Sequence, residues 1–136
     1  MLCFNIWLEI QIFSTAYQHN NKLLYIDKLI IPLPYDFDMS GFINPSYAVV
    51  NETLNIANIQ QRKYRGFKRD EAIFYSVRDI FIEKKSDMLA LIKSFESDFD
   101  NASEYEDAYS YIESFFDIIE DDRKFKDSVI LAARTK

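Results

Sequence analysis

The segment between Lys93 and Arg123 constrains the fold more than any other part of this chain. Within it, apolar residues recur at spacings of three and four, which is the period of an amphipathic helix with one buried face. These apolar residues are Tyr105, Ala108, Ile112, Phe115 and Ile119. The same segment holds eleven carboxylates and no positively charged side chain. We therefore predict a helix over residues 103–122 that packs on one side and carries uncompensated negative charge on the other.

The start and the outer face of this helix are both marked by acidic residues. Ser103, followed three residues later by a glutamate, matches a capping box. The acids that align opposite the apolar stripe are Glu106, Glu113, Asp117 and Glu120, with Asp121 close by. Like charges four residues apart destabilise a helix by about 0.2–0.5 kcal/mol per pair. Anions at a helix C-terminus are also disfavoured by the helix dipole. Such a row is either a solvated surface or a binding face for a cationic partner.

If the row binds a partner, its carboxylates steer a basic protein and neighbouring aromatic side chains anchor it. Tyr109 and Phe116 lie at the edge of the apolar stripe and are the predicted anchors. The predicted partner-binding residues are Glu106, Tyr109, Glu113, Phe116, Asp117, Glu120 and Asp121. The partners that such a surface fits are a nuclease toxin or a nucleic-acid-binding complex, whose basic groove it would occlude. We therefore predict a non-enzymatic inhibitor of the immunity or anti-defence type.

A basic cluster supplies the alternatives to this prediction. Residues 62–69 contain five cations and two aromatic residues, a combination that can grip single-stranded nucleic acid. The net charge of −6 and the isoelectric point of about 4.8 disfavour general attraction to nucleic acid or to an anionic membrane. The cluster is more simply a solvated end, or it docks against acids of the same chain or of a second copy. Pairing of opposite charge poles between copies gives the alternative function, a structural or assembly subunit of viral or mobile-element origin.

Composition argues against several kinds of catalytic and cofactor site. The chain has two glycines, Gly41 and Gly66, too few for a dinucleotide fingerprint, and neither begins a Walker loop. His19 is the single histidine, which rules out a multi-histidine zinc site. Asp98 begins a segment that departs from the calcium-loop pattern at three positions. We predict no cofactor, no metal and no catalytic residue; an enzyme with a carboxylate-based site is the least favoured interpretation.

The first third of the chain predicts strands. Residues 4–13 alternate between apolar and polar, which is the pattern of a strand with one buried face. Residues 22–31 are a second apolar run, and together the two runs predict an antiparallel hairpin with a long connection. Pro32 and Pro34 are predicted to end the second strand, because proline cannot donate to a β-ladder.

The sequence after residue 43 mainly predicts helices. We predict a helix over residues 45–61 with Asn44 as its N-cap and Gly66 beyond its end. Further helices are predicted over residues 70–85, with a strand over 72–77 as the alternative, and over residues 86–99. Ile73, Val77, Ile80 and Phe81 are expected to face the core in the first of these, and Met88, Leu91, Ile92, Phe95 and Phe99 in the second. Residues 129–133 are a short strand or a short helix.

Length and cysteine count indicate the number of domains and the compartment. The chain has 136 residues and is 49% hydrophobic, which fits one globular domain over residues 1–136. Cys3 is the only cysteine, and the apolar beginning of the chain lacks the basic leader of a signal peptide. We therefore predict a cytoplasmic α+β domain, in which an N-terminal antiparallel hairpin or small sheet packs against about four helices.

Overall fold

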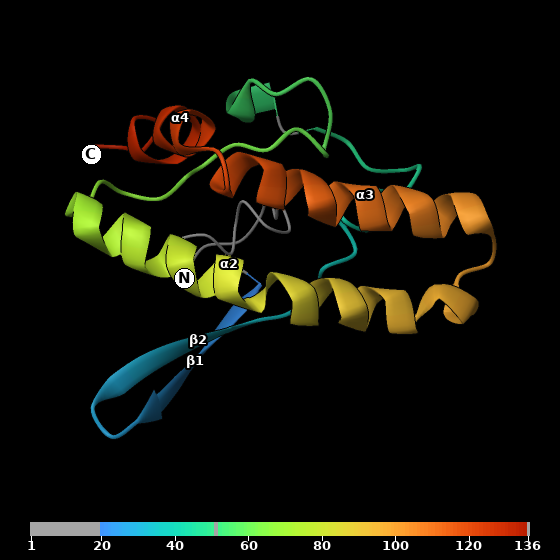
Figure 1. Cartoon of the computed structure of the whole chain (residues 1–136), viewed down its shortest axis with the longest axis horizontal. Helices are drawn as coiled ribbons and strands as arrows, with labels where there is room; N and C mark the ends of the chain where they lie inside the picture. Colours follow the sequence, from blue (N-terminus) through green and yellow to red (C-terminus); the bar gives the residue numbers. More distant parts are fainter. Residues whose placement is uncertain (1–19, 51, 136) are drawn as a thin grey trace.

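The computed structural model describes residues 20–50 and 52–135, and in these residues the fold is α+β (Figure 1). A two-stranded antiparallel sheet precedes an irregular segment and a group of helices. The main elements are β1 (Asn21–Ile26), β2 (Leu29–Pro34), α2 (Glu71–Ser94), α3 (Ala102–Ile119) and α4 (Asp122–Phe125). The predicted fold class is confirmed, with three α-helices in the described residues where about four were expected. The predicted strand over residues 4–13 lies outside the described residues.

Both strands of the sheet arise from the region in which the sequence indicated one. Asp27 and Lys28 have φ values of 47° and 66°, and they form a two-residue turn in which both central residues have positive φ. A turn of this kind matches the twist of the flanking strands and closes a tight hairpin. The predicted single strand over residues 22–31 is therefore wrong, because the chain reverses direction in its middle.

Pro32 and Pro34 lie inside β2, not beyond its end. They pair with Leu23 and Asn21, and the next pair along the ladder is joined by a hydrogen bond of 3.0 Å from the Tyr35 N–H to the Asn20 carbonyl. Hydrogen-bonded and non-hydrogen-bonded pairs alternate in an antiparallel ladder. Both proline nitrogens therefore face away from β1, and the hairpin loses no ladder bond to either of them.

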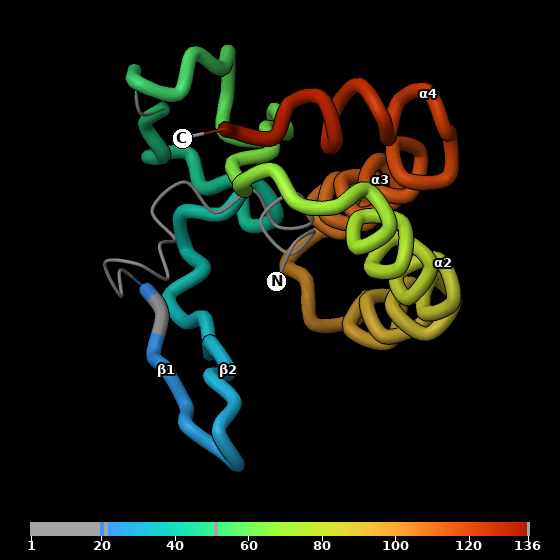
Figure 2. The backbone as a smooth tube through the Cα atoms, turned by 90° about the vertical axis from the view of Figure 1, so that its left-hand side faces the viewer, coloured from blue at the N-terminus to red at the C-terminus, as the bar shows by residue number. Residues whose placement is uncertain are grey.

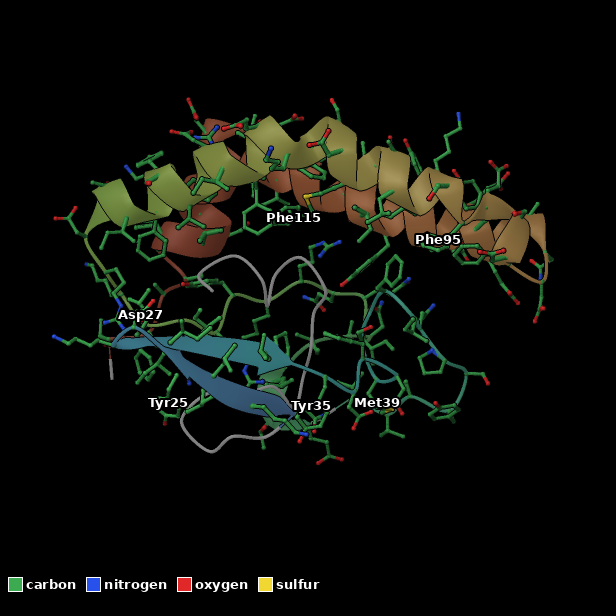
Figure 3. All side chains as sticks on the ribbon, turned by 90° about the horizontal axis from the view of Figure 1, so that it is seen from below. Tyr25, Asp27, Tyr35, Met39, Phe95 and Phe115 are labelled. Carbon is green, nitrogen blue, oxygen red and sulfur yellow. The ribbon has the colours of Figure 1, made fainter. Side chains whose placement is uncertain are left out.

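The hairpin extends away from the helices (Figure 2). Its register places Leu24 opposite Ile31 and Ile26 opposite Leu29, and all four side chains are exposed. In Figure 3 the two long helices form one layer, and the hairpin that carries Tyr25 lies apart from it. The main hydrophobic core therefore does not lie on this sheet.

The segment between the hairpin and α2 is mostly irregular, so the predicted helix over residues 45–61 is wrong. Its described residues contain one three-residue 3-10 helix, η1 (Glu52–Leu54). Asn55 has a φ of 49°, a left-handed conformation that interrupts an α-helix. Asn44, the predicted N-cap, has a φ of 44° and so lacks the extended backbone that an N-cap adopts. Gly66 is not a helix stop either, because the residues before it are not helical and its carbonyl accepts the Arg134 N–H at 3.0 Å.

Helix α2 joins the two helices predicted over residues 70–85 and 86–99. Asp70 caps its start, since its Oδ1 accepts the Ala72 N–H at 2.9 Å. Residues 86–99 were expected to begin a new helix, but Ser86 and Asp87 lie inside this one, because no proline or glycine separates the two periods. The alternative strand over residues 72–77 is excluded. The helix ends at Ser94, and the 3-10 helix η2 (Glu96–Asp98) leads to α3.

The core lies between α2, α3 and the C-terminal segment. Its fully buried side chains include Phe74 of α2, Phe115 of α3, and Phe125 and Val129 near the C-terminus. Residues 129 and 130 belong to a π-helix, η3 (Lys126–Ile130), and the chain then forms a parallel bridge between Phe67 and Arg134.

The buried face of α2 is rotated from the one predicted. Phe74, which was not expected to face the core, is buried, whereas Ile73 and Ile80 are exposed. Leu91 and Phe95 were also expected inside and are exposed. The remaining residues predicted to face the core from this part of the chain are partly buried: Val77, Phe81, Met88, Ile92 and Phe99.

Candidate acidic interface on helix α3

Helix α3 begins slightly earlier than predicted. Its N-cap is Asn101, whose Oδ1 accepts the Glu104 N–H at 3.0 Å and also the hydroxyl of Ser103 at 2.9 Å. The predicted capping box at Ser103 is therefore wrong, because the asparagine two residues earlier performs the capping. In a capping box Glu106 would turn back toward the start of the helix. With Asn101 as the N-cap, Glu106 lies within the helix and its side chain is exposed to solvent.

The predicted apolar stripe of this helix is confirmed. Ala108, Ile112, Phe115 and Ile119 are buried, and Tyr105 is half-buried at the beginning of the stripe. The face opposite carries three exposed carboxylates, Glu106, Glu113 and Asp117, which we call the acidic row. Within residues 20–50 and 52–135, none of the three forms an ion pair.

Phe116 was predicted as a surface anchor, and its position requires a correction. Its side chain is fully buried and packs edge-to-face on Phe115, with ring centroids 5.2 Å apart. Phe116 lies four residues after Ile112, so the two share one helix face and both point into the core. A partner protein on this surface cannot contact Phe116 while α3 stays packed.

The acids at the end of α3 differ from the acidic row, because α2 supplies their counter-charges. Lys85 Nζ contacts both carboxylate oxygens of Glu120, at 2.9 and 2.8 Å. Arg78 donates to Asp122 at 2.6 Å and to the Glu120 carbonyl at 3.2 Å. Acids at a helix C-terminus are disfavoured by the helix dipole. Here two cations that lie more than thirty residues away in the chain offset this cost.

Asp121, the last predicted site residue, has a structural role. It is the N-cap of α4, and its Oδ1 accepts the Lys124 N–H at 2.8 Å. Hydrogen bonds from the backbone N–H groups of Lys124 and Arg123 lower the pKa of the Asp121 carboxyl below its ordinary value. Asp121 and Glu120 remain exposed, but both already bind groups of their own chain: Asp121 caps α4, and Glu120 pairs with Lys85 of α2.

An aromatic group adjoins the acidic row. The ring of Tyr105 lies 5.7 Å from that of Phe99 and 5.8 Å from that of Tyr109, and all three residues are half-buried. Partial burial, and then the neighbouring Glu96, Tyr109 and Glu113 in that order, raise the pKa of the Tyr105 hydroxyl. Tyr105 and Phe99 are absent from the predicted site. The spacing of four between Tyr105 and Tyr109 was the sequence signal that could have identified the first.

The basic cluster at residues 62–69 lies partly against α3. Arg62 donates to the Tyr111 carbonyl and to the Ser114 hydroxyl, and its guanidinium lies 3.9 Å from the centre of the Tyr111 ring. Lys68 and Arg69 at the other end of the cluster are exposed. The cluster is therefore divided between a part that packs on its own chain and a part that faces solvent.

Neither a metal cluster nor a membrane span occurs in the part of the chain that the structure describes. Among the described residues, no group of three or more His, Cys, Asp and Glu side chains is placed to hold a metal ion. No helix in the same part of the chain has both the length and the apolar character needed to cross a membrane.

Comparison of the chain with protein-family models, with curated proteins and with solved structures finds no match.

Proposed function

We propose that this chain is a non-enzymatic binding protein that occludes a basic surface of another protein, in the manner of an inhibitor or immunity protein. The observation that carries the proposal is the acidic row of Glu106, Glu113 and Asp117. Three exposed carboxylates on one face of a packed helix form a fixed negative surface. Such a surface attracts a cationic partner and raises its association rate.

The contrast along α3 supports this proposal. At its C-terminal end, Lys85 and Arg78 compensate the acids, whereas Glu113 and Asp117 remain four residues apart with no counter-charge among the described residues. This like-charge pair costs the helix about 0.2–0.5 kcal/mol. Local rules that a chain breaks without a structural gain are the places where function is expected.

The aromatic group supplies the apolar part of the proposed interface. Interface energy concentrates in a few aromatic or arginine side chains that become desolvated, while surrounding charges set orientation and rate. Tyr109 and Tyr105 are half-buried beside the acidic row and take the role predicted for Phe116. The proposed partner is therefore a protein with a row of lysine or arginine residues next to an apolar pocket, such as the groove of a nuclease toxin.

A second candidate function, assembly through opposite charge poles, is favoured by the exposure of Lys68 and Arg69. This function would join the basic cluster of one copy to the acidic row of another. It differs from inhibition in a simple respect, because neutralising the acidic row would then change the size of the purified chain. In an inhibitor the same change would release the partner and leave the oligomeric state of the chain itself unaltered.

The test compares two variants of equal charge. One neutralises the acidic row with Glu106→Gln, Glu113→Gln and Asp117→Asn. The matched control neutralises three exposed acids elsewhere, with Glu52→Gln, Asp79→Asn and Glu83→Gln. Each variant raises the net charge by the same amount, so a general electrostatic effect acts on both.

Wild type and both variants are immobilised and exposed to lysate of the cells in which the chain is native, at low and at high salt. We expect wild type and control to retain the same basic protein, and the acidic-row variant to lose it. Retention should also fall steeply with salt. Equal retention by the two variants would contradict the proposal.

A further inference from the structure

We propose that a second copy of this chain packs on helix α2 and forms an antiparallel helix pair. The proposal concerns a different surface from the acidic row and does not depend on the proposed function. The surface is a stripe along one side of α2, which we call the α2 stripe. Its members recur at alternating steps of four and three residues: Ile73, Val77, Ile80, Lys84, Asp87 and Leu91. This is the heptad spacing of helices that pair side by side.

The α2 stripe is open to solvent, although it is mainly apolar. Ile73, Ile80 and Leu91 are 47%, 57% and 61% exposed. Phe74 points into the core, and a residue one step along a helix is turned by about 100°, so the stripe lies beside the core-facing side of α2. Lys84 and Asp87 separate Leu91 from the other apolar members, and Val77 is half-buried against the core. Exposed aliphatic side chains rimmed by charged residues mark an interaction site.

The shape of the α2 stripe fits a second helix. A hollow of about 310 Å³ lies along it and is lined by Lys84, Asp87, Met88 and Leu91, with Ile80 and Phe81 at one end. The first four residues are at positions i, i+3, i+4 and i+7. A set with this spacing forms the hole that receives one side chain of a facing helix in knobs-into-holes packing.

Charge complementarity identifies the facing helix as α2 of a second copy. In an antiparallel pair related by a two-fold axis, Lys84 can lie opposite Asp87 of the second copy, and Ile80 then lies opposite Leu91 of the second copy. Val77 lies opposite Ser94, the last residue of α2, so Ile73 lies outside the paired part of the stripe. Each contact occurs twice, as required at a symmetric interface.

Lys84 and Asp87 are both exposed, and the ion pairs of Lys84 within one chain are long, at 3.7 Å to Asp87 and 3.8 Å to Glu83. Exposed pairs of this kind contribute little, so exchanging them for pairs with a second copy costs little. A register that set Lys84 opposite its own copy would be repelled.

This interface is small, so we expect a weak dimer in equilibrium with monomer. Its two ion pairs are at the rim and its apolar contacts come from a few side chains of a single 24-residue helix. Interfaces of this kind belong to the weak, transient class. The acidic row lies on α3, and pairing through the α2 stripe leaves it available for a partner.

The test measures the oligomeric state of the full chain by sedimentation equilibrium, from micromolar to millimolar protein. We expect a reversible dimer. Ile80→Glu should abolish it without loss of fold, because this side chain is 57% exposed and contributes little to the core. Circular dichroism and thermal melting check that the variant is folded. A matched control, Asp79→Lys, changes the charge at the neighbouring exposed position outside the stripe and should leave the dimer unchanged.

A charge exchange tests the register. Lys84→Asp alone and Asp87→Lys alone should each weaken the dimer by roughly tenfold, because each places like charges opposite one another. The double variant Lys84→Asp/Asp87→Lys should restore it. A chain that is monomeric at every concentration would overturn the proposal, whether another protein or another segment of the same chain covers the stripe. A dimer that survives Ile80→Glu, or one that the double variant does not restore, would overturn it equally.

Discussion

The ion pair between Arg78 and Asp122 joins α2 to the start of α4, and its two members have very different environments. The Arg78 side chain is 10% exposed, whereas the Asp122 side chain is 87% exposed, and their atoms are 2.6 Å apart. The guanidinium also lies 5.0 Å from the centre of the Phe125 ring. This asymmetry predicts that removal of the exposed acid costs more stability than removal of the buried cation.

The magnitudes follow from what each substitution leaves behind. Asp122→Ala leaves a buried guanidinium with the Glu120 carbonyl at 3.2 Å as its remaining hydrogen-bond partner among the described residues. Loss of a hydrogen bond between charged groups costs about 1.5–3 kcal/mol in the free energy of unfolding. Arg78→Met leaves a solvated carboxylate and an apolar side chain in an apolar site, and we expect a cost of about 1 kcal/mol or less.

Urea denaturation followed by circular dichroism measures both free energies of unfolding. The double variant Arg78→Met/Asp122→Ala serves as the control, and it should be less destabilised than Asp122→Ala alone, since it no longer contains the unpaired buried cation. A larger loss of stability in Arg78→Met than in Asp122→Ala would refute the reasoning.

Three further predictions concern the acids of α3 and its end. At low salt Asp117→Asn should raise the free energy of unfolding by about 0.5–1 kcal/mol, because it removes a like-charge pair and an anion in the last turn. Glu120→Gln, which breaks an ion pair, should show no such gain; chemical denaturation of both compares them, and a greater stability of Glu120→Gln would contradict the assignment. Glu113→Gln should lower the pKa of Tyr105 slightly, because partial burial and Glu96 contribute more; an NMR titration that resolves Tyr105 from the other eight tyrosines follows it, and a raised pKa would contradict the assignment. The pKa of Asp121 is depressed, so its contribution to stability is present above its ordinary value of 3.8 and is lost as pH falls through the folded value. The stability difference between wild type and Asp121→Ala should therefore shrink on acidification, and a difference that persists at the lowest pH would contradict this role.

The sequence was sufficient where local pattern decides the structure. The apolar period through Ala108, Ile112 and Phe115 predicted both α3 and its buried side, and Asp70 predicted the start of α2. Within the acidic row, the positions opposite this period were correctly expected to be exposed. In each case, residues within one or two helical turns carry the information.

Elsewhere the outcome depended on contacts that local pattern does not contain. Glu120 is compensated by Lys85, thirty-five residues earlier in the chain, and this pairing exists only once α2 and α3 are packed. Phe116 is at the edge of the apolar stripe of α3. It is buried because the core is wide enough to cover that edge as well. The helix expected after Asn44 does not form, and Asn44 and Asn55 have a left-handed backbone instead. The amino-acid composition of this segment does not indicate that conformation.

The two prolines of β2 have a consequence for how this protein can aggregate. Along the outer side of that strand, Ile30 is the one residue of its alternating set that still offers an amide hydrogen, whereas β1 keeps its outward donors. Within the described residues, an incoming strand therefore finds a full row of donors on a single flank of the sheet. Two hairpins that met through β1 would present proline on both outer margins, so growth would stop at a closed pair and would not continue into a fibril.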